Sequence, residues 1–154
     1  MRSQLITRAA DMQDQRTYAV VLSTGEEVTN ALQAFAVEQG LNAAQVTALG
    51  AFSSVELGYF DWQAKDYRKI PIDEQVEVLS LVGGIALKDG VPHLHPHVTI
   101  AKRDGSAWGG HLLRGIVRPT LEVIITESPS VLARRYDPET GLALITPEES
   151  RVGS

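Results

Sequence analysis

The sequence contains no cysteine, which excludes disulfide bonds and thiolate metal ligands. A metal site in this chain has to use histidine, aspartate or glutamate. Positive charge is also scarce, because 14 Lys and Arg face 19 Asp and Glu, for a formal net charge of −5. This balance argues against a broad basic surface for nucleic acid or an anionic membrane.

Long apolar runs are missing as well. No segment approaches the roughly 20 apolar residues of a membrane span, and the N-terminal stretch is too charged for a signal peptide. We therefore expect a cytoplasmic protein. The chain also lacks a glycine-rich phosphate loop, a G-x-S-x-G motif and internal repeats. Its 154 residues, 44% of them apolar, suit one domain, predicted at residues 1–146 and followed by a frayed tail at residues 147–154.

The apolar pattern predicts an α+β fold, in which an antiparallel sheet of about seven or eight strands carries one main flanking helix. Thr24 is expected to cap the helix, with Glu26 and Glu27 in its first turn, and Gly40 to end it. Two segments, 61–69 and 134–139, are expected to be loops, and residues 11–16 a polar turn. Gly50 is expected to form a kink or bulge, and Gly83-Gly84 to break the strand that contains them. Strands are predicted at residues 4–7, 17–23, 45–52, 53–59, 74–87, 94–101, 106–117, 120–126 and 142–146.

All four histidines lie in one stretch, P-H-L-H-P-H-V-T-I-A-K-R-D-G-S-A-W-G-G-H, at residues 92–111. Side chains two residues apart on a strand point to the same face. His93, His95 and His97 should therefore share one face, with the apolar residues between them facing the core. Three imidazoles in a row are unusual on the solvent face of a sheet, which makes this stretch the main candidate for chemistry.

The turn after this strand decides which face receives the last histidine. A three-residue loop, R-D-G at 103–105, with its glycine left-handed, would pair His97 with His111 on the same face. A two-residue D-G turn would instead pair Val98 with His111 and direct that ring to the core. We favour the first register because it lets His95 join the other two rings.

Three histidines with an open fourth position are typical of catalytic zinc, although neutral imidazole also suits Fe, Ni, Co and Cu. The alternative is a set of exposed or hydrogen-bonded histidines without a metal. His93, at the start of the strand, would line the mouth of the pocket or face solvent. Glu56 and Glu122 are candidates to hydrogen-bond a metal-binding histidine, the alternative being ordinary solvated glutamates.

Two neighbouring features have two interpretations each. Gly109-Gly110 either lets the backbone approach a ligand closely or forms a bulge that shifts the register. Trp108 packs either in the core or at a subunit interface. The pair Arg134-Arg135 is expected in a solvated loop.

Several motifs together resemble the plant and prokaryote conserved domain, the PPC domain. They are H-P-H at 95–97, R-D-G at 103–105, W-G-G-H-L-L at 108–113 and T-L-E-V-I-I-T-E at 120–127. Earlier segments fit too: G-E-E before the helix, A-L-G-A-F-S-S-V-E-L-G-Y-F-D at 48–61 and V-L-S-L-V-G-G-I-A at 78–86.

This resemblance implies an antiparallel sheet with a flanking helix, assembled as a homotrimer. It also implies a metal, usually zinc, on His95, His97 and His111, whereas His93 falls outside the motif. The fold is similar to that of acetolactate decarboxylase, which by analogy makes binding of, or action on, a small polar molecule conceivable.

The plant members of the family associate with DNA through a separate AT-hook arm, so the resemblance also suggests a DNA-associated regulatory module. This chain has no such arm, since R-G-I-V-R at 114–118 has the pattern of a strand. Because lysine and arginine neutralise phosphates in most nonspecific DNA binding, the negative net charge opposes this alternative.

Overall fold

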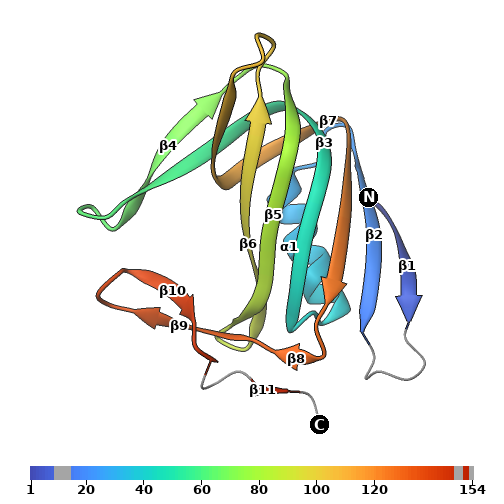
Figure 1. Cartoon of the computed structure of the whole chain (residues 1–154), viewed down its shortest axis with the longest axis vertical. Helices are drawn as coiled ribbons and strands as arrows, with labels where there is room; N and C mark the ends of the chain where they lie inside the picture. The colour runs from blue at the N-terminus through green and yellow to red at the C-terminus, as the bar shows by residue number, and fades with distance from the viewer. Residues whose placement is uncertain (9–14, 148–150, 153–154) are drawn as a thin grey trace.

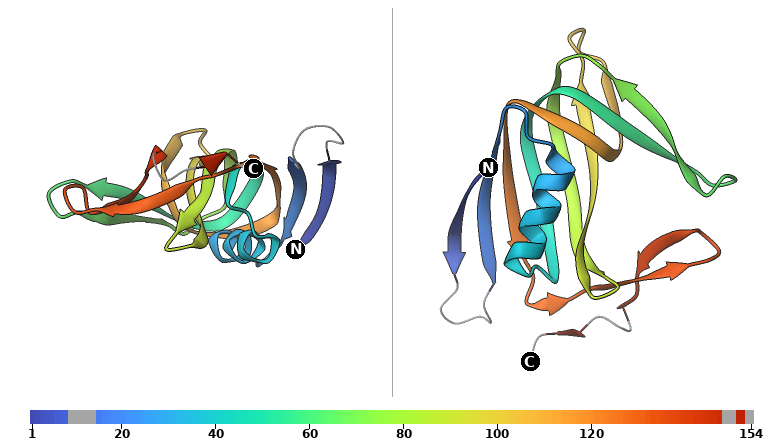
Figure 2. Two further views of the ribbon diagram at one scale, coloured as in Figure 1. Left: turned by 90° about the horizontal axis from the view of Figure 1, so that it is seen from below. Right: turned by 180° about the vertical axis from the view of Figure 1, so that it is seen from behind.

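The structure, a computed structural model, describes residues 1–8, 15–147 and 151–152. In this part of the chain, a nine-stranded, predominantly antiparallel sheet carries one α-helix on one of its faces (Figures 1 and 2). This confirms the predicted α+β class, with more strands than expected. No helix within these residues has the length and apolarity needed to cross a lipid bilayer. The elements are β1 (Arg2–Arg8), β2 (Arg16–Ser23), α1 (Val28–Gln39), β3 (Ala43–Asp61), β4 (Asp66–Ile72), β5 (Val76–Lys88), β6 (Val91–Ala101), β7 (Ala107–Glu127), β8 (Ser130–Val131), β9 (Ala133–Asp137), β10 (Leu142–Ile145) and β11 (Arg151–Val152).

Four strands close the centre of the sheet into a ring. β3 pairs with β5 and β7, and β6 pairs with the same two strands. The long strand β7 makes this possible, because its first half pairs with β6 and its second half with β2. Apolar side chains from all four strands and from α1 fill the interior, including Phe52, Leu57, Leu81, Ile100 and Leu112, each at most 1% exposed.

The helix α1 packs against this core through Val28, Leu32 and Phe35, as its apolar spacing predicts. It ends at Gly40, which has the expected left-handed conformation (φ 63°). The expected cap at Thr24 is wrong.

Glu27 caps the helix instead, and its carboxylate accepts hydrogen bonds from the backbone N–H groups of Thr29 and Asn30 at 3.1 and 2.8 Å. The same carboxylate also accepts from the N–H of Gly115 on β7 at 3.1 Å, so it ties the helix to the sheet. Thr24 lies before a glycine turn (Gly25, φ 90°), which places it too early to reach the helix.

The helix also contacts β6 through Gln33. Its side-chain amide donates to the carbonyl of Pro92 at 2.6 Å and accepts from the N–H of Leu94 at 2.9 Å. This part of β6 has no partner on β7, which pairs with β6 only from His97 to Ala101.

Several predicted boundaries are wrong. Residues 43–61 form one strand rather than a pair, and Gly50 supplies the expected bulge within it. Gly83 and Gly84 do not break β5, and β7 continues through Pro119. The expected turn at 11–16 lies mostly outside the described residues.

Two predicted loops are largely strands. Residues 66–72 form β4, which pairs with β3, and residues 133–137 form β9, which pairs with β10 and runs parallel to the end of β5. Both are short and polar, so their own sequences carry little apolar alternation. The frayed tail from residue 147 stays a prediction, although Arg151–Val152 is described as a strand paired with β8.

Candidate metal centre

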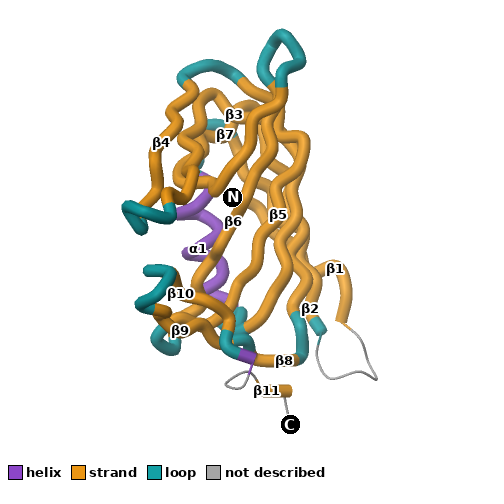
Figure 3. Tube along the Cα trace, turned by 60° about the vertical axis from the view of Figure 1, so that its left-hand side comes forward, coloured by secondary structure: helices purple, strands orange, loops and turns teal. Residues whose placement is uncertain are grey.

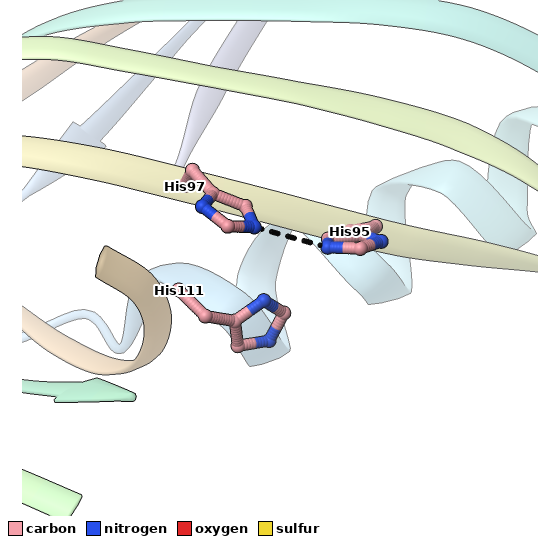
Figure 4. A group of neighbouring side chains, drawn as sticks. All are labelled: His95, His97 and His111. Atoms are coloured by element: carbon pink, nitrogen blue, oxygen red, sulfur yellow. Dashed lines mark hydrogen bonds between the residues drawn. The ribbon is translucent and has the colours of Figure 1, made fainter. Parts of the chain in front are cut away.

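The β6–β7 hairpin brings three histidines together (Figure 4). His97 lies directly opposite His111 in the ladder, and the loop closes with the N–H of Lys102 donating to the carbonyl of Ser106 at 2.9 Å. Gly105 has φ 82°, as the three-residue loop requires. The favoured register is therefore confirmed, and His95, two residues before His97, shares their face.

The three side chains converge closely. One ring nitrogen from each of His95, His97 and His111 lies within 4.8 Å of the other two. The Nε2 atoms of His95 and His97 are 3.1 Å apart. Nitrogens bound tetrahedrally at about 2.0 Å from one zinc ion are about 3.3 Å apart. The donor set and its spacing therefore fit a divalent metal after only small side-chain rotations.

The surroundings keep two of these rings neutral. Burial, followed by the positive charges of Arg134, His97 and His93, lowers the pKa of His95 to about 4. Burial, followed by the charges of the other histidines, lowers the pKa of His111 to about 4 as well. A neutral imidazole has a free nitrogen lone pair, which metal binding requires. His111 Nδ1 is also buried without a hydrogen-bond partner in the described part of the chain. A nitrogen that binds a metal needs no such partner.

Tyr67 on β4 supports His111 from outside the hairpin. The two rings stack, with centroids 4.7 Å apart and planes at 27°. Gly58, opposite His111 in the ladder, makes room for this contact, because a Cβ there would lie 2.8 Å from Cδ1 of Tyr67. Tyr67 was not predicted as a site residue because residues 61–69 were expected to form a loop. Only Ile70 and Ile72 alternate in this segment, which is too weak a signal for a strand.

Gly109 and Gly110 do not form the bulge that one of their two interpretations predicted. β6 and β7 pair without a register shift along them. A Cβ on Gly110 would lie 2.8 Å from the carbonyl oxygen of Gly58, and one on Gly109 would lie 3.1 Å from that of Val98. The glycines therefore allow β7 to pass close to the backbones of its neighbouring strands. Their predicted approach to a ligand stays a prediction.

The other predicted site residues do not join the cluster. His93 shares its face but pairs with Ala86, one repeat further from the hairpin loop than His95. Glu56 forms an ion pair with Lys69 at 3.1 Å. Glu122 lies on the second half of β7 and is exposed. Within the described residues, neither carboxylate hydrogen-bonds a histidine.

Trp108 does not lie in the core. It is 44% exposed opposite Ile100, and the Lys102 ammonium lies 5.4 Å from its ring centroid. Its predicted place at a subunit interface stays a prediction. The predicted solvated loop at Arg134 is also wrong, because Arg134 lies half-buried in β9.

Two hairpins flank the histidine face. The β3–β4 hairpin brings Tyr67 to His111, and the β9–β10 hairpin brings Arg134 close enough for its charge to lower the pKa of His95. Their turns lie side by side (Figure 3). Lys65 Nζ in one turn donates to the carbonyl of Pro138 in the other at 2.8 Å. The candidate centre is thus bordered by chain segments far apart in the sequence.

An antiparallel sheet that brings together three strand histidines able to hold a metal ion defines a class of small β-domain. The sequence matches the Plants and Prokaryotes Conserved (PCC) domain over residues 9–129. The chain belongs to this family, which is also called the PPC-domain family.

Solved structures of similar fold support this membership. A PPC protein from Pyrococcus horikoshii is 31% identical, with a TM-score of 0.81 over 90% of this chain and 96% of that chain. A protein from Bacteroides thetaiotaomicron, described as a candidate DNA-binding protein, is 30% identical, with a TM-score of 0.83 over 86% and 93%. A protein from Archaeoglobus fulgidus described as metal-containing is 35% identical, with a TM-score of 0.78 over 84% and 92%.

Two further comparisons carry less weight. Acetolactate decarboxylase from Bacillus subtilis has a TM-score of 0.52 at 14% identity, over 79% of this chain and 53% of that chain, so the predicted likeness holds for the fold alone. Among curated proteins, the bifunctional protein GlmU of Synechococcus sp. (strain JA-3-3Ab) is 35% identical over 82% of this chain. This chain spans about a fifth of the length of that relative, since it covers 20% of it.

Proposed function

We propose that this PPC-domain protein binds a divalent metal, zinc in the first place, through His95, His97 and His111, and presents it to a small polar molecule. The observation that carries the proposal is the convergence of three ring nitrogens within 4.8 Å. The metal-containing relative from Archaeoglobus fulgidus supports it. Three protein ligands leave a coordination position free for an exogenous group.

The residues of this chain prepare the site in two ways. Burial keeps His95 and His111 neutral by lowering the pKa of each to about 4, so both can bind metal well below pH 7. Stacking on Tyr67 fixes the plane of the His111 ring. A bound divalent ion would supply Lewis acidity and an exchangeable position at this point of the sheet.

Metal analysis of protein purified without a histidine tag or chelator tests the proposal. Wild-type protein should contain about one zinc or other divalent ion per chain, and His97→Ala should lose it. His93→Ala is the matched control, because His93 lies on the same face of the same strand outside the cluster, and this variant should keep its metal. Equal metal content in the wild type and His97→Ala would refute the site.

We also propose that the chain forms the homotrimer that the family resemblance implies. The sheet face opposite the helix exposes Leu49 (60%), Val82 (50%) and Ile124 (40%), beside a hollow lined by His97, Ser80 and Thr99 among others. Burial of this apolar area would favour self-association. Light scattering after size exclusion should give three times the mass of the chain, and Leu49→Lys should reduce it to that of a monomer.

DNA association is a second candidate, because the Bacteroides relative is described as a candidate DNA-binding protein. The net charge of −5 opposes it, as do the ion pairs that engage Lys69 with Glu56 and Lys102 with Glu74. We expect no mobility shift of duplex DNA at about 50 mM salt. A complex that weakens steeply with added salt would favour this candidate instead.

A further inference from the structure

Arg134 is the most unusual charged residue near the histidine face. Its Nη1 donates to the carbonyl of Ala143 on β10 at 3.3 Å, yet its Nε is buried and has no hydrogen-bond partner among the described residues. Nor does any described carboxylate form an ion pair with it. Burial lowers its pKa, which means that the surroundings disfavour the charged guanidinium. A half-buried arginine of this kind is costly unless an anion completes its surroundings.

The position of Arg134 relative to the histidines follows from the ladder. Its Nη2 lies 4.0 Å from where a Cβ on Gly84 would stand. Gly84 pairs directly with His95 across β5 and β6, and opposite residues in a ladder share a face. The guanidinium therefore lies beside His95, on the face where the three rings converge. Its charge contributes to the lowered pKa values of both His95 and His93, which agrees with this placement.

The backbone holds the arginine there. β9 pairs in parallel with the end of β5, placing Ala133 opposite Leu87, and the N–H of Leu87 donates to the carbonyl of Leu132 at 2.7 Å. The β9–β10 hairpin is braced in turn by Lys65 of the β3–β4 turn. Because successive side chains on a strand point to opposite faces, Arg135 projects away from Arg134 and is exposed.

A guanidinium beside a divalent metal would repel it if nothing lay between them. An oxyanion would remove this repulsion, because one of its polar atoms can bind the metal while its negatively charged oxygens bind the arginine. The planar fork of arginine matches carboxylate and phosphate groups. The unpartnered Nε–H is one of the donors such a fork would use.

We propose that Arg134 is an anion-binding residue that selects small oxyanions, carboxylates or phosphates, for the open position of the three-histidine centre. The inference rests on the proposed metal site and narrows its ligand from any small polar molecule to an anion. Gly84 lies beside the guanidinium, 4.0 Å from where its Cβ would stand, which leaves this side of the arginine uncrowded.

The test uses full-length protein loaded with Co²⁺, whose visible absorption reports the entry of a ligand at the metal. Wild type, Arg134→Gln, Arg134→Lys and Arg135→Gln are titrated with glycolate, with inorganic phosphate and with the neutral ester methyl glycolate. Arg135→Gln is the matched control, because it removes the same charge from the neighbouring residue. Thermal unfolding of each variant shows whether it is folded.

Wild type and Arg135→Gln should bind glycolate or phosphate similarly, whereas Arg134→Gln should weaken the binding at least about 10-fold with an unchanged cobalt content. Arg134→Lys should restore part of the affinity, and the ester should bind weakly to every variant. Comparing the glycolate and phosphate titrations tells which oxyanion the site prefers. Three results would overturn this inference without affecting the metal site. They are equal oxyanion affinity in wild type and Arg134→Gln, a preference for the ester, and no anion binding by cobalt-loaded wild type. Wild type that takes up no cobalt would overturn the metal site and this inference together.

Discussion

The two faces of β6 differ in what they contain. On one face, Val98 and Ile100 are at most 3% exposed and belong to the core. On the other, His95 and His97 point toward His111, with space around them. Alternate residues of one strand thus serve stability and chemistry separately, since the period of two assigns each residue to one face. Substitutions on the two faces should therefore have separable effects.

The largest expected effect is on the core face. Ile100→Ala should lower the free energy of unfolding by about 2–5 kcal/mol, because it leaves a cavity where the wild-type side chain is 0% exposed. Urea denaturation measures the loss, and the folded fraction should bind metal with unchanged stoichiometry. Loss of metal from folded Ile100→Ala protein would show that the two faces are coupled.

The next effect concerns the histidine face. Tyr67→Leu keeps an apolar side chain but removes the ring stacked on His111. Metal affinity should fall about 10-fold, as for other groups that orient a ligand, with little change in unfolding free energy. Competition with a chromogenic chelator measures the affinity. A Tyr67→Phe variant, which retains the ring, should behave as wild type, and a 10-fold loss there would assign the effect to the hydroxyl instead.

A smaller effect is expected where the helix joins the sheet. Glu27→Ala removes a carboxylate that accepts from the N–H groups of Thr29, Asn30 and Gly115. The free energy of unfolding should fall by about 1–2 kcal/mol, in the range of a lost helix cap. Because Thr24 bonds to Pro119 rather than to the helix, Thr24→Ala should cost the helix nothing. A larger loss for Thr24→Ala than for Glu27→Ala would contradict the observed cap.

The last expected effect is a gradual dependence on pH in metal-free protein. Burial lowers the pKa of His95 and His111 to about 4, whereas both titrate near 6.5 in the unfolded chain. Between pH 6.5 and 4 the unfolded chain therefore binds protons that the folded chain does not, so the unfolding free energy falls as pH drops through this window. Above pH 6.5 this contribution is constant. Denaturation of chelated protein at pH 7, 5.5 and 4 measures it, and His95→Asn should reduce the slope.

The hairpin and its register were predictable because their determinants are local. The R-D-G loop at 103–105 fixes which residues pair, and alternation assigns the histidines to a face. Gly40 and the apolar spacing likewise predicted the end and the buried side of α1. The cap was mispredicted by three residues, because threonine is a favoured capping residue and glutamate is not, while the turn at Gly25 keeps Thr24 away from the helix.

The residues around the histidines could not be predicted in this way. Tyr67 and Arg134 lie in β4 and β9, polar strands that are defined by pairing with β3 and β5 rather than by their own pattern. The ring of Tyr67 needs Gly58, where a Cβ would lie 2.8 Å from it, and the guanidinium of Arg134 lies beside Gly84. Nothing in the local sequence links Tyr67 to Gly58 or Arg134 to Gly84.

The amide of Gln33 has a consequence for solubility. It forms two hydrogen bonds with the backbone of β6, one with Pro92 and one with Leu94. A neighbouring strand would otherwise form these bonds. An open strand edge can recruit a strand from another chain and begin aggregation. Because the Gln33 side chain occupies the edge of β6 at Pro92 and Leu94, a strand from another chain cannot pair there.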